Sequence, residues 1–120
     1  MTLSELKVNF PSATEETWHQ HFNGGGWVEN TAYVGEDAFV GPDAQVYGNA
    51  WVGESAHISD RAAVFGNAMI YGRGMVYDTA WVSGNARVSG EARVYGEAMV
   101  YGNARVSGNA WVYPNSTDTI

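Results

Sequence analysis

The chain of 120 residues has no cysteine, and it has few prolines, histidines and basic residues. The absence of cysteine excludes disulfides and thiolate metal ligands and leaves the redox compartment open. Six Lys and Arg residues stand against thirteen Asp and Glu residues, a net charge of −7, so we expect no binding to duplex nucleic acid. No apolar run is long enough to span a membrane, and Met1–Phe10 lacks the layout of a signal peptide. These features predict a cytoplasmic protein with no membrane partner.

The charge is unevenly distributed along the chain. Residues 1–60 hold nine acidic residues and one lysine, whereas residues 61–120 hold five arginines and four acidic residues. We therefore expect an acidic end and an arginine-bearing, near-neutral end of the molecule.

A six-residue repeat begins at Val28. Its β-branched positions are Val28, Val34, Val40, Val46, Val52, Ile58, Val64, Ile70, Val76, Val82, Val88, Val94, Val100, Val106 and Val112. A small residue follows each one four places later, from Ala32 to Ser116, and so stands two places before the next β-branched residue. That spacing puts both on one side of a strand, and the Gly, Asn, Pro and Asp residues between them favour turns. The repeat predicts an all-β solenoid of about five triangular coils, with three units in each coil.

The first 26 residues do not repeat. Ser12 and Glu15 form a capping-box pattern, Trp18 and Phe22 have helical spacing, and three glycines follow at 24–26. We therefore predict a short helix over roughly 12–22 that caps the first coil. The expected organisation is a cap over 1–26, the solenoid over 27–113 and a C-terminal tail over 114–120.

One corner of the predicted coil is unusually regular. Four Gly-Asn pairs recur one coil apart, at Asn49, Asn67, Asn85 and Asn103. We expect the asparagines to take the left-handed backbone conformation and their amides to hydrogen-bond along the column.

The repeat units also resemble those of a known family. Units such as Val34-Gly-Glu-Asp-Ala-Phe and Val40-Gly-Pro-Asp-Ala-Gln are similar to the hexapeptide repeat of left-handed parallel β-helix proteins. Later units such as Val100-Tyr-Gly-Asn-Ala-Arg resemble a variant found in small bacterial and phage proteins. The resemblance implies a left-handed coil and a homotrimer with parallel axes, in which intersubunit grooves often bind nucleotide-containing ligands.

The large aromatic residues of the solenoid must lie outside, because its core positions hold almost only Val, Ile and Ala. Monomers rarely expose large contiguous apolar patches, so one aromatic face is the expected oligomer interface. The alternative is that the aromatic columns only stabilise neighbouring strands by stacking. The interface residues that we predict are Trp27, Tyr47, Phe65, Trp81, Met99 and Tyr101.

A second set of residues combines arginine with aromatic side chains, which can hold a phosphate and a base. We therefore expect a small nucleotide-like ligand, or a protein partner, between subunits. The alternative is that these arginines keep the surface soluble and pair with Glu91 and Glu97. The candidate ligand-binding residues are Arg87, Arg105, Arg93, Trp51, Tyr77 and Tyr95.

Catalysis is the competing hypothesis. The resemblance implies it, because many hexapeptide-repeat proteins are acyl-coenzyme A-dependent acyltransferases that use a histidine as general base. His57 is the candidate base here. No insertion interrupts the six-residue count, so no loop is available to build a pocket, and we favour a non-catalytic scaffold.

A zinc site needs converging ligands, whereas His19 and His21 diverge on the predicted helix and His57 stands alone. The acidic residues lie at different corners, so we expect no metal and no cofactor.

Overall fold

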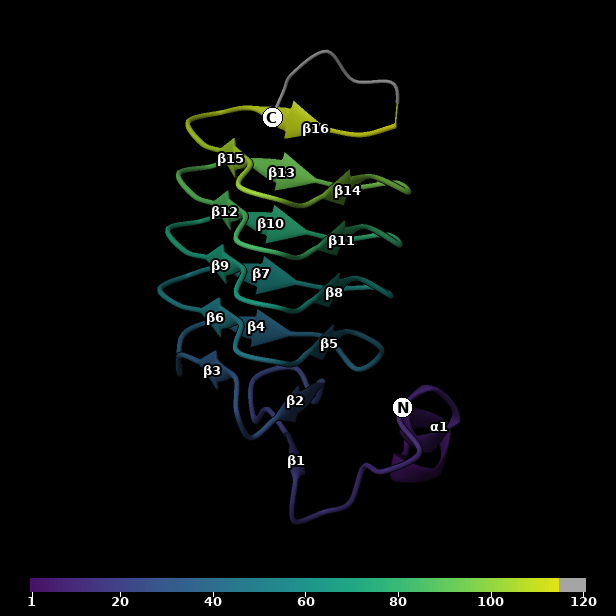
Figure 1. Ribbon diagram of the computed structural model, residues 1–120. Coiled ribbons are helices and arrows are strands. Elements are labelled where there is room, and N and C mark those ends of the chain that lie inside the picture. The colour runs from purple at the N-terminus through teal and green to yellow at the C-terminus, as the bar shows by residue number, and fades with distance from the viewer. Residues whose placement is uncertain (115–120) are drawn as a thin grey trace.

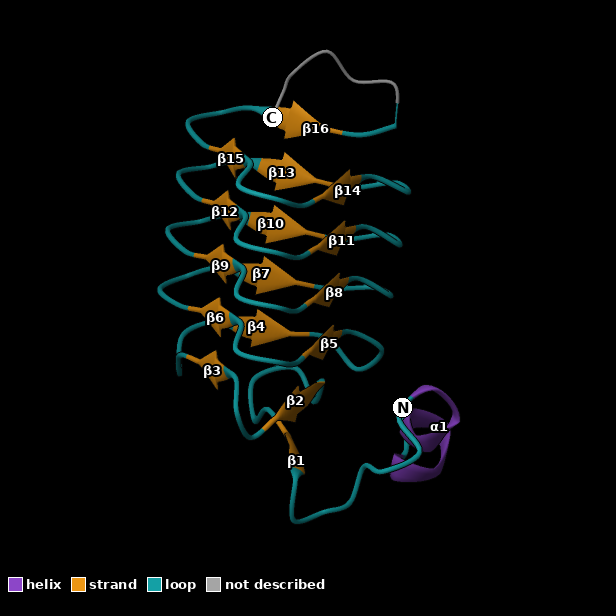
Figure 2. Ribbon diagram, viewed as in Figure 1, coloured by secondary structure: helices purple, strands orange, loops and turns teal. Residues whose placement is uncertain are grey.

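The protein is a stack of coils built from very short strands, and its computed structural model describes residues 1–114 (Figures 1 and 2). Helix α1 (Leu3–Asn9) and strand β1 (Trp18–Gln20) precede the coils. The coil strands are β2 (Trp27–Glu29), β3 (Tyr33–Val34), β4 (Phe39–Val40), β5 (Gln45–Val46), β6 (Trp51–Val52), β7 (His57–Ile58), β8 (Ala63–Val64), β9 (Met69–Ile70), β10 (Met75–Val76), β11 (Trp81–Val82), β12 (Arg87–Val88), β13 (Arg93–Val94), β14 (Met99–Val100), β15 (Arg105–Val106) and β16 (Trp111–Val112).

These strands form three parallel sheets, one on each side of the coil. Sheet A contains β2, β5, β8, β11 and β14, sheet B contains β3, β6, β9, β12 and β15, and sheet C contains β4, β7, β10, β13 and β16. Each strand pairs with the strand one coil further on, so that Val28 lies beside Val46 and Tyr33 beside Trp51. The prediction of an all-β parallel solenoid of about five turns is confirmed.

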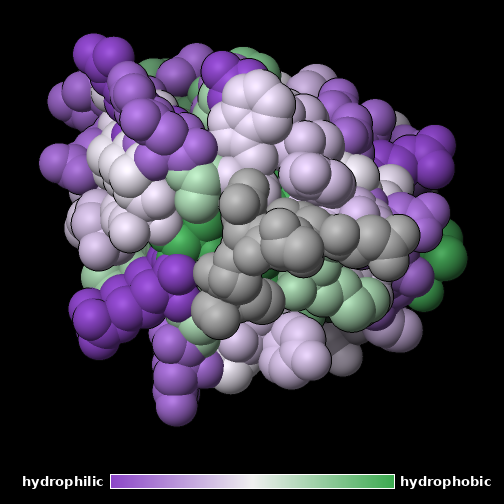
Figure 3. Space-filling model, turned by 90° about the horizontal axis from the view of Figure 1, so that it is seen from above, coloured by the Kyte–Doolittle hydropathy of each residue, from purple (hydrophilic) through white to green (hydrophobic). Residues whose placement is uncertain are grey.

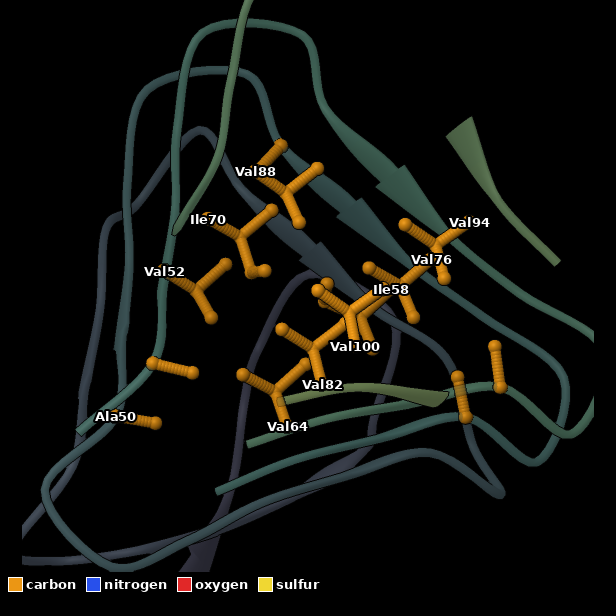
Figure 4. Packing of buried hydrophobic residues seen from close by; sticks show 14 of the residues in the cluster. Ala50, Val52, Ile58, Val64, Ile70, Val76, Val82, Val88, Val94 and Val100 are labelled. Carbon is orange, nitrogen blue, oxygen red and sulfur yellow. The ribbon is translucent and has the colours of Figure 1, made fainter. Parts of the chain in front are cut away.

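The core is a column of β-branched side chains that point inward from all three sheets (Figure 4). Val64, Val82 and Val100 of sheet A are fully buried, and so are the inward residues of the middle coils of sheets B and C. The alanines pack between them near the corners. Val34 in the first coil is only partly buried. Ser116, the last small residue of the repeat, lies outside the described residues.

The left-handed residue at the Gly-Asn corner is the glycine, so the expectation for the asparagines is wrong. Gly48, for example, has φ of 70°, and the N–H of Asn49 donates to the carbonyl of Gly66 one coil above at 2.8 Å. The Asn85 amide also donates to the Asn103 amide oxygen at 3.4 Å. Glycine takes this conformation without a steric cost, and the asparagine that follows keeps ordinary backbone angles.

The predicted helix over 12–22 is also wrong. The helix lies earlier, where Thr2 and Glu5 form a complete capping box, and the Thr2 backbone N–H lowers the pKa of the Glu5 carboxyl. Trp18 begins strand β1, which pairs antiparallel with β2. Trp18 is buried while Phe22 is 77% exposed, so the two do not share a face. Strand pairing prevails here because it covers the open edge of the first coil.

The glycines at 24–26 form the turn between β1 and β2. A Cβ at Gly24 would lie 2.2 Å from the carbonyl oxygen of Val40, and one at Gly26 would lie 2.3 Å from a methyl group of the same residue. Close backbone approach therefore explains Gly24 and Gly26, whereas Gly25 has a positive φ of 81°. No helix among residues 1–114 is long and apolar enough to cross a membrane.

Candidate binding surfaces

The lower half of sheet A is covered by the N-terminal segment of the chain itself. The indole N–H of Trp27 donates to the carbonyl of Met1 at 2.8 Å, and Trp27 is only 5% exposed. The ring of Phe10 packs 4.8 Å from the rings of both Trp18 and Tyr47. Trp27 and much of Tyr47 are therefore covered within one chain. Trp27 itself therefore offers little surface to a partner. The sequence pattern did not show that residues 1–18 fold against this sheet.

The upper half of sheet A remains exposed. Phe65 stacks on Tyr47 with ring planes 4° apart and meets Trp81 edge-on. Trp81 on β11 is 47% exposed, Met99 on the adjacent strand β14 is 56% exposed, and Tyr101, which follows β14, is 66% exposed. These residues form an apolar surface on β8, β11 and β14, hereafter the upper A surface.

A groove of about 650 Å³ lies between α1 and sheet A. Its floor includes Ala63, whose small side chain leaves space below Trp81. Two of its carboxylates already have partners within the chain, since Glu5 caps α1 and Asp43 lies 3.5 Å from the Met1 amine. The groove was missed from the sequence because it depends on the position of α1. It is lined by Met1, Glu5, Asn9, Phe10, Asp43, Gln45, Tyr47, Arg61, Ala63 and Trp81.

Sheet B carries an aromatic pair at one end and an arginine pair at the other. Tyr33 and Trp51 stack with ring centroids 5.2 Å apart. Trp51 leans over Gly53, where a Cβ would lie 2.4 Å from two ring carbons. Arg87 and Arg105 lie directly opposite each other on β12 and β15, and both are exposed. Within residues 1–114 neither arginine forms an ion pair.

Sheet C carries the remaining candidate ligand residues. Arg93 lies over the ring of Trp111, 5.4 Å from its centroid. Tyr77, Tyr95 and Tyr113 form a stacked column with centroids 5.2 and 5.4 Å apart. The six predicted ligand residues are therefore divided between two faces, and one chain does not bring them together. Glu91, a proposed partner of these arginines, pairs instead with Arg73 at 3.6 Å.

The three histidines lie apart. His57 stacks on Phe39 with centroids 4.3 Å apart and planes 8° apart, half-buried on sheet C. His21 is buried, and its Nε2–H donates to the carbonyl of Ala38 at 2.8 Å. Nδ1 of the exposed His19 lies 2.7 Å from the Asn30 amide oxygen. In the part of the chain that the structure describes, no group of three His, Cys, Asp or Glu residues could hold a metal ion.

Seen from the C-terminal end, hydrophilic residues occupy much of the rim, with hydrophobic residues exposed between them (Figure 3).

Three segments, residues 44–60, 80–96 and 98–114, match the family model described as YdcK Beta solenoid repeat. The fold is a β-solenoid, and these three segments are similar to that family's repeat. Each matched segment of the solenoid covers one coil, β5 to β7, β11 to β13 and β14 to β16. No curated protein and no solved structure matches the chain.

Proposed function

We propose that the solenoid is a non-catalytic scaffold that associates with copies of itself through the upper A surface. The observation that carries this proposal is the exposure of Trp81 and Met99 on adjacent strands and of Tyr101 directly after the second strand. Burying such a surface against another copy removes apolar area from water, which favours association. A left-handed coil and a trimer with parallel axes, which the hexapeptide-repeat resemblance implies, belong to the same proposal.

A ligand, in this proposal, is held between copies. The candidate residues of sheets B and C lie on different faces of one chain, so only neighbouring subunits would combine them. The cation–π contact of Arg93 with Trp111 and the stacked tyrosines beside it offer a planar group an aromatic surface with a positive charge. A nucleotide-like molecule has both a planar ring and negative charge.

Light scattering after size-exclusion chromatography tests the self-association. We expect a mass that is a multiple of 13.0 kDa at micromolar concentration. The variant Trp81→Ser with Met99→Ser should show a lower mass than the wild type, whereas the control Met75→Ser, on sheet C, should not. A wild-type chain that is monomeric at this concentration contradicts the proposal. Acyl transfer from acyl-coenzyme A that is lost in His57→Ala would contradict the non-catalytic part.

A further inference from the structure

The outward side chains of sheet B differ in chemical character between its two ends. Its central strand is β9, with two strands on either side. The outward column, in spatial order, is Tyr33, Trp51, Met69, Arg87 and Arg105. Two aromatic residues thus lie on one side of a central methionine and two arginines lie on the other.

This order is self-complementary when one copy is turned end to end. A two-fold axis along β9 would place Met69 against Met69 of a second copy. Trp51 would then face Arg87 of that copy, and Tyr33 would face Arg105. Guanidinium groups favour aromatic rings, so all four outer positions gain cation–π contacts. An interface in which the same patch meets itself is the usual form of a symmetric dimer.

Charge selects the end-to-end orientation over the parallel one. Parallel axes would put the arginine pairs of the two copies at the same height, and like charges brought together are destabilising. In the reversed orientation each arginine pair meets the end of the partner that carries exposed Glu36 and Asp37, at the corner after β3. Within residues 1–114, Arg87 and Arg105 have no carboxylate partner of their own, so negative charge at that end of the second copy favours the reversed orientation.

The second outward column of sheet B holds mostly small residues. It holds Gly35, Gly53, Tyr71, Ser89 and Ser107, so four of its five side chains are small or absent. The reversal places each glycine opposite a serine of the second copy. At the axis Tyr71 would face Tyr71 of the second copy, and the Trp51 ring leans over Gly53, so the contact along this column is between these rings and the opposing small residues.

From these observations we infer that sheet B is the interface of an antiparallel two-fold dimer of this chain. Five strands about 4.8 Å apart give a face about 24 Å high, and the molecule is 21 to 26 Å across its shorter axes. Face-to-face contact would then bury on the order of 1,000 Å² in total, which is at the lower end for a specific complex. The dimer is accordingly weak, reversible and sensitive to salt. It is independent of the upper A surface, and at Trp51, Arg87 and Arg105 it is an alternative to the ligand proposed above.

Single-cysteine cross-linking tests the geometry, because the chain has no cysteine of its own. Met69→Cys places a thiol at the two-fold axis and should form a disulfide-linked dimer under mild oxidation at least ten times faster than Met75→Cys. Met75 is the matched control, on the neighbouring sheet C of the same coil. Ser107→Cys should behave like that control, since its two copies would lie four strand spacings apart, about 19 Å. Equal rates for the variants at 69 and 75, or rapid cross-linking at 107, overturn the inference.

A measurement on the arginines guards against an altered fold in the cysteine variants. Sedimentation equilibrium of Arg87→Gln with Arg105→Gln should show a dissociation constant raised at least tenfold, with Arg61→Gln unchanged. Saturable binding of inorganic pyrophosphate to a chain that stays monomeric would assign the arginine pair to an anionic ligand and overturn the dimer. Met99→Cys reports association through the upper A surface, so failure of that proposal and failure of this one are distinguishable.

Discussion

The carboxylate of Asp78 accepts a hydrogen bond from the backbone N–H of Gly96, one coil above, at 2.9 Å. Asp78 holds a positive φ of 60°. In the same way, Asp60 accepts from the N–H of Asp78 and Glu54 accepts from the N–H of Gly72. In the described part of the chain, these three acids are the non-glycine residues with positive φ. A carboxylate that bridges two coils therefore compensates where a corner lacks glycine.

We predict that Asp78→Ala lowers the free energy of unfolding by about 1 kcal/mol, because the bond to Gly96 is lost and the left-handed backbone remains strained. Asp78→Gly should cost less, since glycine removes that strain. Urea unfolding followed by circular dichroism checks the order. An alanine variant as stable as the glycine variant would show that the carboxylate contributes nothing.

A second prediction separates backbone strain from contact between coils. Gly84 and Gly102 occupy the same corner with φ of 66°. A Cβ at Gly84 would lie 2.8 Å from the nitrogen of Gly102, whereas a Cβ at Gly102 meets nothing within 4 Å among residues 1–114. Gly102→Ala should cost about 1–2 kcal/mol from strain alone. Gly84→Ala should cost more, and thermal unfolding that shows equal losses would contradict the role of the contact.

A third prediction concerns the N-terminal cap. Leu6 is fully buried among Ala13, Trp18 and Trp27, so Leu6→Ala should destabilise the cap by about 2–5 kcal/mol. Val8, on the same helix, is 78% exposed, and Val8→Ala is the matched control. Because coils contact only their neighbours, the loss should stay local. Limited proteolysis should cut residues 1–17 faster in the first variant while the upper coils stay intact.

The coils were predictable because one local rule holds in each of them. When a β-branched residue recurs every six places, each one can be buried only by pointing into the coil. The register of the sheets then follows from the three six-residue units in each coil. The order Tyr33, Trp51, Met69, Arg87 and Arg105 along sheet B could therefore be derived before the structure was known.

The cap was not predictable by the same means, because two capping signals competed. Thr2 with Glu5 and Ser12 with Glu15 are both acceptable helix starts, and the choice depended on tertiary contacts. Trp18 gains more from burial in a strand beside β2 than from a helical neighbour. The covered half of sheet A and the groove beside Ala63 depend on that choice, so they could not be predicted from the repeat pattern either.

The pH dependence of the cap follows from Tyr47. Burial, together with the negative charge of Glu29, raises the pKa of the Tyr47 phenol above its ordinary value. The folded chain then keeps the phenolic proton at a pH where the unfolded chain has lost it. The stabilisation is therefore complete below about pH 10 and is lost as the pH rises through the folded pKa. Tyr47→Phe should flatten the fall in the urea midpoint above about pH 10, whereas Tyr101→Phe, on the same sheet, should not. An unchanged slope in Tyr47→Phe would assign the alkaline loss to other groups.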